Sequence, residues 1–199
     1  MSRRDVWLVA PYAAWMALMA ALPGTAACYA VRGAATAVLL AFSLARGGAF
    51  GGEGRPAVGP LAAWGAGLAA GLAVFAVWIA PEVLLGAGGS AEAAAPSPYS
   101  PSVCGWPLTA CKLAASAFVI PAAEELFFRR WLVDFAGFWW MVALFAVEHG
   151  DRWHVGAAAG IIYGLVARRC GLGAAIIAHS ATNLVLGLYV VLFDRWTYW

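Results

Sequence analysis

The sequence predicts an all-α protein, a polytopic transmembrane bundle of seven to eight helices. Of its 199 residues, 64% are hydrophobic and only 11% are charged, whereas a soluble domain carries about 25% charged residues. Several apolar runs reach the roughly 20 residues that a helix needs to cross a hydrocarbon core. These runs are continuous and lack the apolar–polar alternation of transmembrane β-strands, so helices are expected throughout.

Seven apolar segments are the expected spans, and turn or loop signals separate them. Pro23 and Gly24 form a turn after the first span, residues 46–59 are rich in glycine, and residues 81–107 are polar and rich in proline. An eighth span would arise if residues 81–107 re-entered the membrane. The seven expected spans are residues 6–22, 27–45, 60–80, 108–133, 138–149, 154–167 and 172–193.

These segments are expected to form a single transmembrane domain, residues 1–199. Residues 1–80 hold the N-terminal spans, residues 81–107 form an extracytoplasmic loop, and residues 108–193 form a core that carries almost all the chemistry described below. The formal net charge is only +2, and no long basic run is present. A nucleic-acid partner is therefore not expected.

Arginine placement predicts the orientation, because cytoplasmic loops are enriched in Lys and Arg. No Lys or Arg occurs between Arg55 and Lys112, so the loop at residues 81–107 is expected outside. Arg32 lies within the second span, near its start, and is expected to extend its side chain to the interface. The N-terminus is expected to be cytoplasmic, in a bacterial inner (plasma) membrane. The arginines on the cytoplasmic side are then Arg3, Arg4, Arg46, Arg55, Arg129, Arg130, Arg168 and Arg169.

Three glycines recur at four-residue spacing in the sixth span: Gly156, Gly160 and Gly164. They share one face of the predicted helix, where their lack of side chains lets a neighbouring helix pack closely. A tight contact there would also hold the helices of a functional site rigidly.

Two adjacent glutamates stand in an apolar stretch, although each ionisable residue at mid-membrane costs at least about 2.5 kcal/mol. Glu125 and Arg129 are four residues apart, so they share a helix face and are expected to pair. Glu124 points about 100° away from Glu125. It is left without a local cationic partner and is expected to face a cavity.

Two further groups of polar residues interrupt apolar spans. His149 ends one stretch and lies one turn from Phe145, while its neighbour Glu148 points elsewhere and is expected to meet Arg152 or water. In the last span, His179 and Asn183 are four residues apart and project from one face. They form either a pair of hydrogen-bond donors aimed at one point or polar contacts that join helices.

With the N-terminus cytoplasmic, the polar residues fall at a common depth. Glu124, His149 and His179 each lie roughly 10–17 Å from the cytoplasmic end of their helix, at 1.5 Å per residue. Three residues from different spans can therefore meet at one level, which predicts a shared site.

These residue types suit the hydrolysis of an amide by water. A carboxylate beside an imidazole can take a proton from water, and paired donors can stabilise the oxyanion that forms. A GxSxG nucleophile elbow, paired intramembrane aspartates and an HExxH motif are all absent from the sequence. Zinc held by Glu124, His149 and His179 has suitable ligand types and stays an alternative, but the expectation is no metal and no cofactor.

Three short motifs, in order along the chain, resemble those of a known family. EELFFR at residues 124–129 fits EExxxR, FAVEH at 145–149 fits FxxxH, and HSATN at 179–183 fits HxxxN. These are the motifs of the CPBP family, which includes the type II CAAX prenyl endopeptidases, also called glutamic intramembrane proteases. The resemblance covers about residues 108–193 and implies a bundle of about eight transmembrane helices with a cavity open to the cytosol.

The resemblance also implies a role for each motif residue. Glu124 and His149 would activate a water molecule, and His179 and Asn183 would form the oxyanion hole. The supporting residues are then Glu125, Arg129 and Phe145. The FAVEHG and RCGLGAAIIAH stretches further resemble the exosortase-associated CAAX-protease-related proteins of bacteria.

The function that follows is a metal-independent intramembrane endopeptidase, a hydrolase. Its partners would be the lipid bilayer and a membrane-associated protein or peptide substrate. Three alternatives stay open: a non-enzymatic immunity or scaffold protein that binds a partner in the membrane, a zinc-dependent membrane protease, and a transporter or channel with a proton relay.

Overall fold

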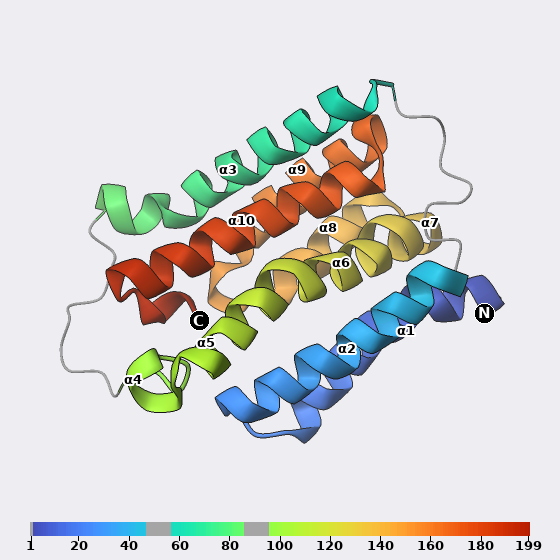
Figure 1. Cartoon of the computed structure of the whole chain (residues 1–199). Helices are drawn as coiled ribbons and strands as arrows, with labels where there is room; N and C mark the ends of the chain where they lie inside the picture. The colour runs from blue at the N-terminus through green and yellow to red at the C-terminus, as the bar shows by residue number, and fades with distance from the viewer. Residues whose placement is uncertain (1, 47–56, 86–95) are drawn as a thin grey trace.

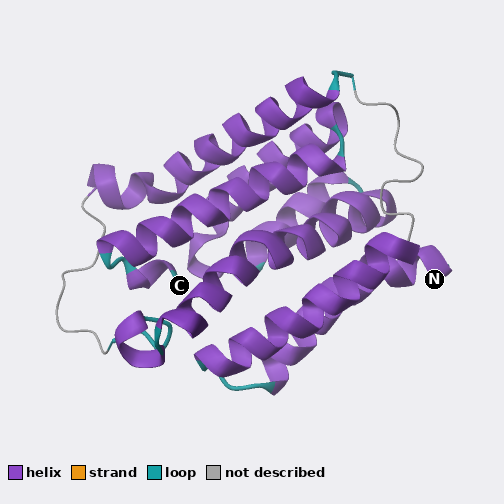
Figure 2. Ribbon diagram, viewed as in Figure 1, coloured by secondary structure: helices purple, strands orange, loops and turns teal. Residues whose placement is uncertain are grey.

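The computed structural model describes residues 2–46, 57–85 and 96–199, and this part of the chain is helical without any strand (Figures 1 and 2). The all-α fold class is confirmed, and each of the seven expected spans corresponds to a helix. The separate helices are α1 (Arg3–Ala21), α2 (Ala26–Arg46), α3 (Pro60–Leu85), α4 (Pro101–Cys104), α8 (Phe138–Val147), α9 (Trp153–Cys170) and α10 (Leu172–Phe193).

One long helix runs through the centre of the bundle without a break. It joins α5 (Trp106–Ala114), α6 (Ile120–Glu125) and α7 (Val133–Ala136) through two π-helical segments, Ala115–Val119 and Leu126–Leu132. In Figure 1 it lies between the α1–α2 pair on one side and α3, α9 and α10 on the other. π-Helical segments change the direction of the side chains that follow and often occur at functional sites.

Four helices are long and apolar enough to cross a membrane: α2, α3, the continuous α5–α7 helix and α10. The shorter α8 is also apolar. Helix α3 continues through Pro81 to Leu85, beyond the expected end at residue 80. A proline is tolerated inside a membrane helix where neighbouring groups satisfy the freed backbone atoms. The possible eighth span involves residues 86–95, which lie outside the described residues; the loop's described end forms the short α4.

The glycine strip of α9 packs directly on α8, as the spacing predicted. A Cβ at Gly156 would lie 3.0 Å from the side chain of His149, and a Cβ at Gly160 would lie 3.3 Å from Phe145. Both are tighter than ordinary carbon contacts. The absence of side chains on this face therefore sets how closely α9 approaches two residues of the motif FAVEH.

Helices α3 and α10 make a second close contact. A Cβ at Gly71 would overlap the carbonyl oxygen of Ala178, and the Thr182 hydroxyl donates a hydrogen bond to the Gly71 carbonyl oxygen at 2.7 Å. Gly171 starts α10 with φ of +88°, a conformation that favours glycine. It allows α10 to turn back sharply along α9.

The Arg32 side chain does not extend out of the helical bundle. Its side chain is buried, with the guanidinium carbon 5.5 Å from the ring centre of Trp15 and 5.3 Å from that of Tyr29. The expectation from the sequence is wrong because these rings, one from α1 and one from α2 itself, enclose the cation and stabilise it where it lies.

We predict that Gly71→Ala destabilises the protein, because the added methyl group would overlap the backbone of α10. The expected loss is about 1–3 kcal/mol, measured by thermal unfolding of the detergent-solubilised protein. Gly65→Ala on the same helix is the matched control, since nothing lies within 4 Å of a Cβ there. Equal melting temperatures for the two variants would contradict the tight α3–α10 contact.

Candidate active site

Glu125 is the centre of a buried polar cluster. Its Oε1 atom lies 3.0 Å from Arg129 Nη1 and accepts a hydrogen bond from His179 Nδ1 at 2.9 Å. The side chains of all three residues are almost completely buried. The ion pair predicted from the four-residue spacing is present, and its carboxylate also holds a histidine from the last helix.

Aromatic rings cover the Arg129 guanidinium. Its central carbon lies 4.0 Å from the ring centre of Phe145 and 5.5 Å from that of Tyr163. Its Nε, Nη1 and Nη2 atoms have no hydrogen-bond partner among the described residues. The cation is therefore stabilised by the nearby charge of Glu125 and by ring faces rather than by hydrogen bonds.

The ring of His179 is held in a single orientation. Tyr163 stacks on it, with ring centres 4.8 Å apart and planes inclined by 22°, and the Tyr163 hydroxyl donates to Thr182 at 2.7 Å. Because Nδ1 binds Glu125, the opposite nitrogen faces Glu124. The distance from His179 Nε2 to Glu124 Oε2 is 3.6 Å.

Glu124 and Glu125 are in different surroundings, as the 100° offset predicted. The side chain of Glu125 is fully buried, whereas that of Glu124 is 13% exposed. Glu124 interacts electrostatically with Glu148 and with Tyr12. It is thus the one carboxylate of the pair that keeps some access to solvent.

His149 lies in a turn after α8 rather than at the end of the helix, where the sequence placed it. Helix α8 ends at Val147, and Gly150 has φ of +55°, which lets the chain turn at this point. The Nδ1 atom of His149 donates to the Phe145 carbonyl oxygen at 2.6 Å. In the neutral ring Nε2 therefore keeps a free lone pair.

The Phe145 ring lies between the two histidines. Its centre is 4.8 Å from the ring centre of His149 and 5.8 Å from that of His179. The two histidines are near enough to interact electrostatically. Trp78 of α3 packs on the other side of His149, with ring centres 5.3 Å apart.

Asn183 joins α10 to the central helix. Its Nδ2 atom donates to the Ser116 carbonyl oxygen at 3.0 Å. In the π-helical segment the Ile120 N–H binds the Ala115 carbonyl oxygen, and the next residue, Pro121, has no N–H to give. The carbonyl of Ser116 is therefore free for Asn183, whose amide group keeps a second hydrogen.

Two residues near the site were not found from the sequence. Tyr12, on α1, donates a hydrogen bond to Glu148, and Tyr163 stacks on His179. Glu148 was expected to meet Arg152 or water. That expectation is wrong, because the turn after α8 directs Glu148 toward α1. No local pattern signals a contact between residues 136 positions apart.

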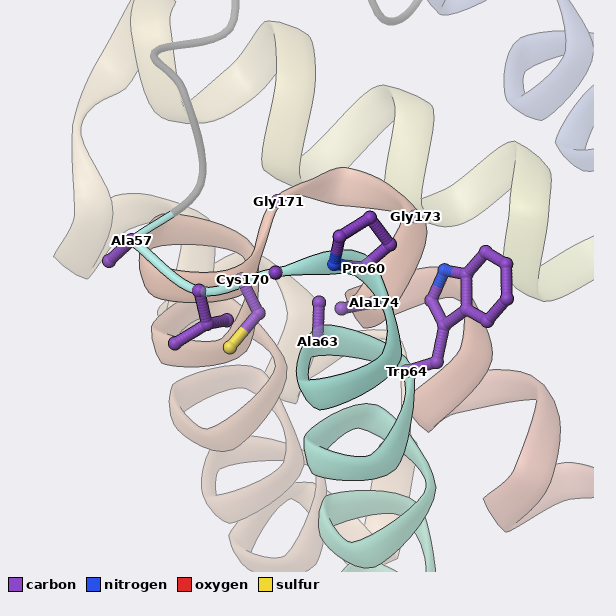
Figure 3. Close-up of a pocket in the computed structure, with 10 residues that line it drawn as sticks. Ala57, Pro60, Ala63, Trp64, Cys170, Gly171, Gly173 and Ala174 are labelled. Carbon is purple, nitrogen blue, oxygen red and sulfur yellow. The ribbon is translucent and has the colours of Figure 1, made fainter.

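Among the described residues, no three His, Cys, Asp or Glu side chains are grouped as metal ligands. A cavity of about 580 Å³ lies near the first turns of α3 and α10, beside the end of α9 (Figure 3). It is lined by Pro60, Trp64, Cys170 and Ala174, among others, and not by Glu124 or His179. The cavity is thus separate from the polar cluster.

We predict that Glu125→Gln destabilises the protein by about 3–5 kcal/mol, because it leaves the buried Arg129 without its counter-charge. The measurement is thermal or chemical unfolding in detergent. Asp134→Asn is the matched control: Asp134 also pairs four residues along the same helix, with Arg130, but its side chain is 69% exposed, and such a pair contributes about 0–1 kcal/mol. Similar losses of unfolding free energy in Glu125→Gln and Asp134→Asn would contradict the stabilising role of the buried Glu125–Arg129 pair.

Residues 106–185 match a family model described as type II CAAX prenyl endopeptidase Rce1-like. This match contains the three motifs and confirms the family resemblance for this part of the chain. It does not distinguish the exosortase-associated subgroup, which stays a prediction. The searches of curated proteins and of solved structures gave no match. The apolar helices and the family together indicate an integral membrane protein.

Proposed function

We propose that the protein is an intramembrane endopeptidase that hydrolyses a peptide bond of a membrane-associated substrate. The observation that carries the proposal is the position of Glu124, which lies 3.6 Å from His179 in a helical bundle and is 13% exposed. A partly accessible carboxylate facing an imidazole that is held by a buried ion pair suits proton transfer from water. The family match supports a protease of the CAAX type.

Glu124 and His149 are proposed to activate the water. Glu124 is a carboxylate without an arginine or lysine partner among the described residues, so its charge is not already neutralised. The hydrogen bond from His149 Nδ1 to the Phe145 carbonyl leaves Nε2 as a proton acceptor. Each residue can therefore accept a proton, and the Phe145 ring restricts the movement of the imidazole.

His179 and Asn183 are proposed to stabilise the oxyanion. Glu125 holds Nδ1 of His179 by a hydrogen bond, so the Nε2 side of the ring points toward the space beside Glu124, where a proton carried on Nε2 would be donated to the oxyanion. Asn183 uses one amide hydrogen on the Ser116 carbonyl oxygen and keeps the other for the substrate. Fixed donors of this kind stabilise a developing charge without having to reorient during the reaction.

We propose that the protein lies in a bacterial inner membrane with its N-terminus in the cytoplasm; the arrangement of arginines supports this orientation. In Figure 1 the N-terminus, the end of α2 and α7 lie on the same side of the bundle. Arg46 is in the last turn of α2, and Arg168 and Arg169 are in the last turn of α9. Basic residues collected at one end are typical of the cytoplasmic face.

We predict that Glu124→Gln abolishes cleavage while preserving the fold. The amide is nearly isosteric but cannot accept a proton, and loss of a general base lowers the rate by about 10²–10⁴-fold. The measurement does not require a known substrate. New protein termini are compared between membranes of cells that express the wild type and membranes of cells that express the variant. Thermal unfolding checks the fold.

The same variant separates the enzyme from a binding protein. A non-enzymatic immunity or scaffold function predicts that Glu124→Gln retains the cellular phenotype of the wild type. The proposed peptidase would be refuted if cells with the wild type and cells with Glu124→Gln contained the same set of new protein termini and showed the same phenotype.

For the purified enzyme and a substrate found in this way, we predict that Asn183→Ala lowers kcat by about 10²–10³-fold, the usual cost of losing one oxyanion donor. A zinc chelator should leave the wild-type rate unchanged. Loss of activity with the chelator, restored by added zinc, would instead establish the metal-dependent alternative on Glu124, His149 and His179.

A further inference from the structure

The turn that carries His149, residues 148–152, is short and irregular. The His149 N–H donates to the Ala146 carbonyl oxygen at 3.0 Å, and its own carbonyl oxygen accepts from the Arg152 N–H at 3.1 Å. Gly150, with φ of +55°, follows directly. Because the hydrogen-bond ladder of α8 stops here, contacts from other segments decide how firmly His149 is held.

Helix α1 holds the first residue of this turn. The Tyr12 hydroxyl donates a hydrogen bond to the Glu148 carboxylate, and the Tyr12 side chain is buried. Its ring is fixed in turn by Phe127, with ring centres 4.6 Å apart, and by Phe128 at 5.3 Å. Since Glu148 immediately precedes His149, this bond limits the movement of the turn on the side of α1.

The segment that follows α10 holds the last residue of the turn. The guanidinium carbon of Arg152 lies 4.1 Å from the ring centre of Tyr198, which belongs to the short 3₁₀ helix Trp196–Tyr198. Tyr198 also interacts electrostatically with Glu82 of α3. A cation is attracted to the face of an aromatic ring, so the pair of Arg152 and Tyr198 ties the turn to this segment.

Helix α3 connects the segment after α10 to the imidazole ring itself. Trp78 packs on His149, with ring centres 5.3 Å apart. Glu82 lies one turn further along the same helix face, and its Oε1 atom is 3.3 Å from Nε of Arg195. The side chain that covers the ring and the side chain that holds the segment after α10 therefore come from one face of one helix.

The residues that support the turn in this way all lie outside the part of the chain that matches the family. They precede residue 106 or follow residue 185: Tyr12, Trp78, Glu82 and Tyr198. Within the matched part, the Phe145 carbonyl oxygen accepts the hydrogen bond from His149 Nδ1. That bond sets the rotation of the ring, whereas the place of the backbone that carries the ring depends on the two ends of the turn.

We propose that Tyr12 and Tyr198 are positioning residues for His149. They fix the two ends of its turn and so hold the imidazole in the orientation in which Nε2 accepts a proton. This inference rests on the proposed peptidase function, in which His149 helps to activate the water. A displacement of about 1 Å in a catalytic group can lower the rate about 10²-fold, so support of the turn affects the reaction although neither tyrosine is proposed to touch the substrate.

The test observes the His149 ring directly, by NMR of the full chain in detergent at a pH where imidazole is neutral. The chain has three histidines, so ¹⁵N-labelled histidine gives few ring signals, and those of His149 are assigned by their loss in His149→Gln. In the wild type, the bond to the Phe145 carbonyl oxygen should give one tautomer, with the proton on Nδ1. In Tyr198→Leu and in Tyr12→Phe, the two nitrogen signals should move toward those of an imidazole that exchanges between tautomers.

Conservative and matched variants separate positioning from general damage to the fold. Tyr198→Phe keeps a ring over Arg152 and should leave the His149 signals close to those of the wild type. Asp151→Asn is the matched control, because Asp151 lies in the same turn but is exposed, and it should leave them unchanged. The His179 signals should stay in place in Tyr198→Leu, which shows that the polar cluster remains folded.

Cleavage rates then show whether the orientation of His149 matters for the reaction. With a substrate found by the comparison of protein termini, Tyr198→Leu and Tyr12→Phe should each lower kcat about tenfold with little change in KM, whereas Asp151→Asn should not. Added to His149→Ala, the same two substitutions should have no further effect on kcat, because substitutions that act through one side chain are not additive.

Unchanged His149 signals in a tyrosine variant would overturn the positioning role of that tyrosine. So would a full further loss of kcat when its substitution is added to His149→Ala. Both results leave the proposed peptidase intact, because wild-type cleavage is measured separately. If the signals move as expected but the wild type generates no new protein terminus, the peptidase is refuted and the support of the turn stands.

Discussion

The buried carboxylate of Glu125 is the constraint on which the rest of the site depends. It lies between the Arg129 guanidinium and the Nδ1 atom of His179, so one charge satisfies a cation from the central helix and fixes a ring from α10. Without it, a guanidinium would be buried without a counter-charge, and the His179 ring would lose the hydrogen bond that directs its Nε2 atom toward Glu124. The stability of the core and the geometry of the polar cluster therefore depend on the same oxygen atom.

Close approach between helices gives this ion pair its surroundings. Gly156 and Gly160 let α9 pack on α8, which presses His149 and Phe145 against the cluster, and Gly71 lets α3 approach α10. In a membrane, helices gain little from burying apolar surface, so small residues and interhelical hydrogen bonds supply much of the association. The glycines thus shape the polar cluster without contributing a side chain to it.

Contacts with the polar cluster and the central helix extend beyond the part of the chain that matches the family. Tyr12 of α1 binds Glu148, and Arg32 and Tyr29 of α2 lie beside Lys112 of the central helix. The N-terminal helices therefore pack against the matched segment through these side chains.

The sequence by itself determined the helical membrane fold, the seven helical segments and the Glu125–Arg129 pair, because these depend on apolar run length and on helical periodicity, which are local. Only the tertiary structure decided that His149 lies in a turn, that Glu148 meets Tyr12, and that Arg32 is buried rather than interfacial. Those outcomes depend on which distant helix packs alongside. A one-dimensional pattern shows which face of a helix a residue occupies, but not which partner that face meets.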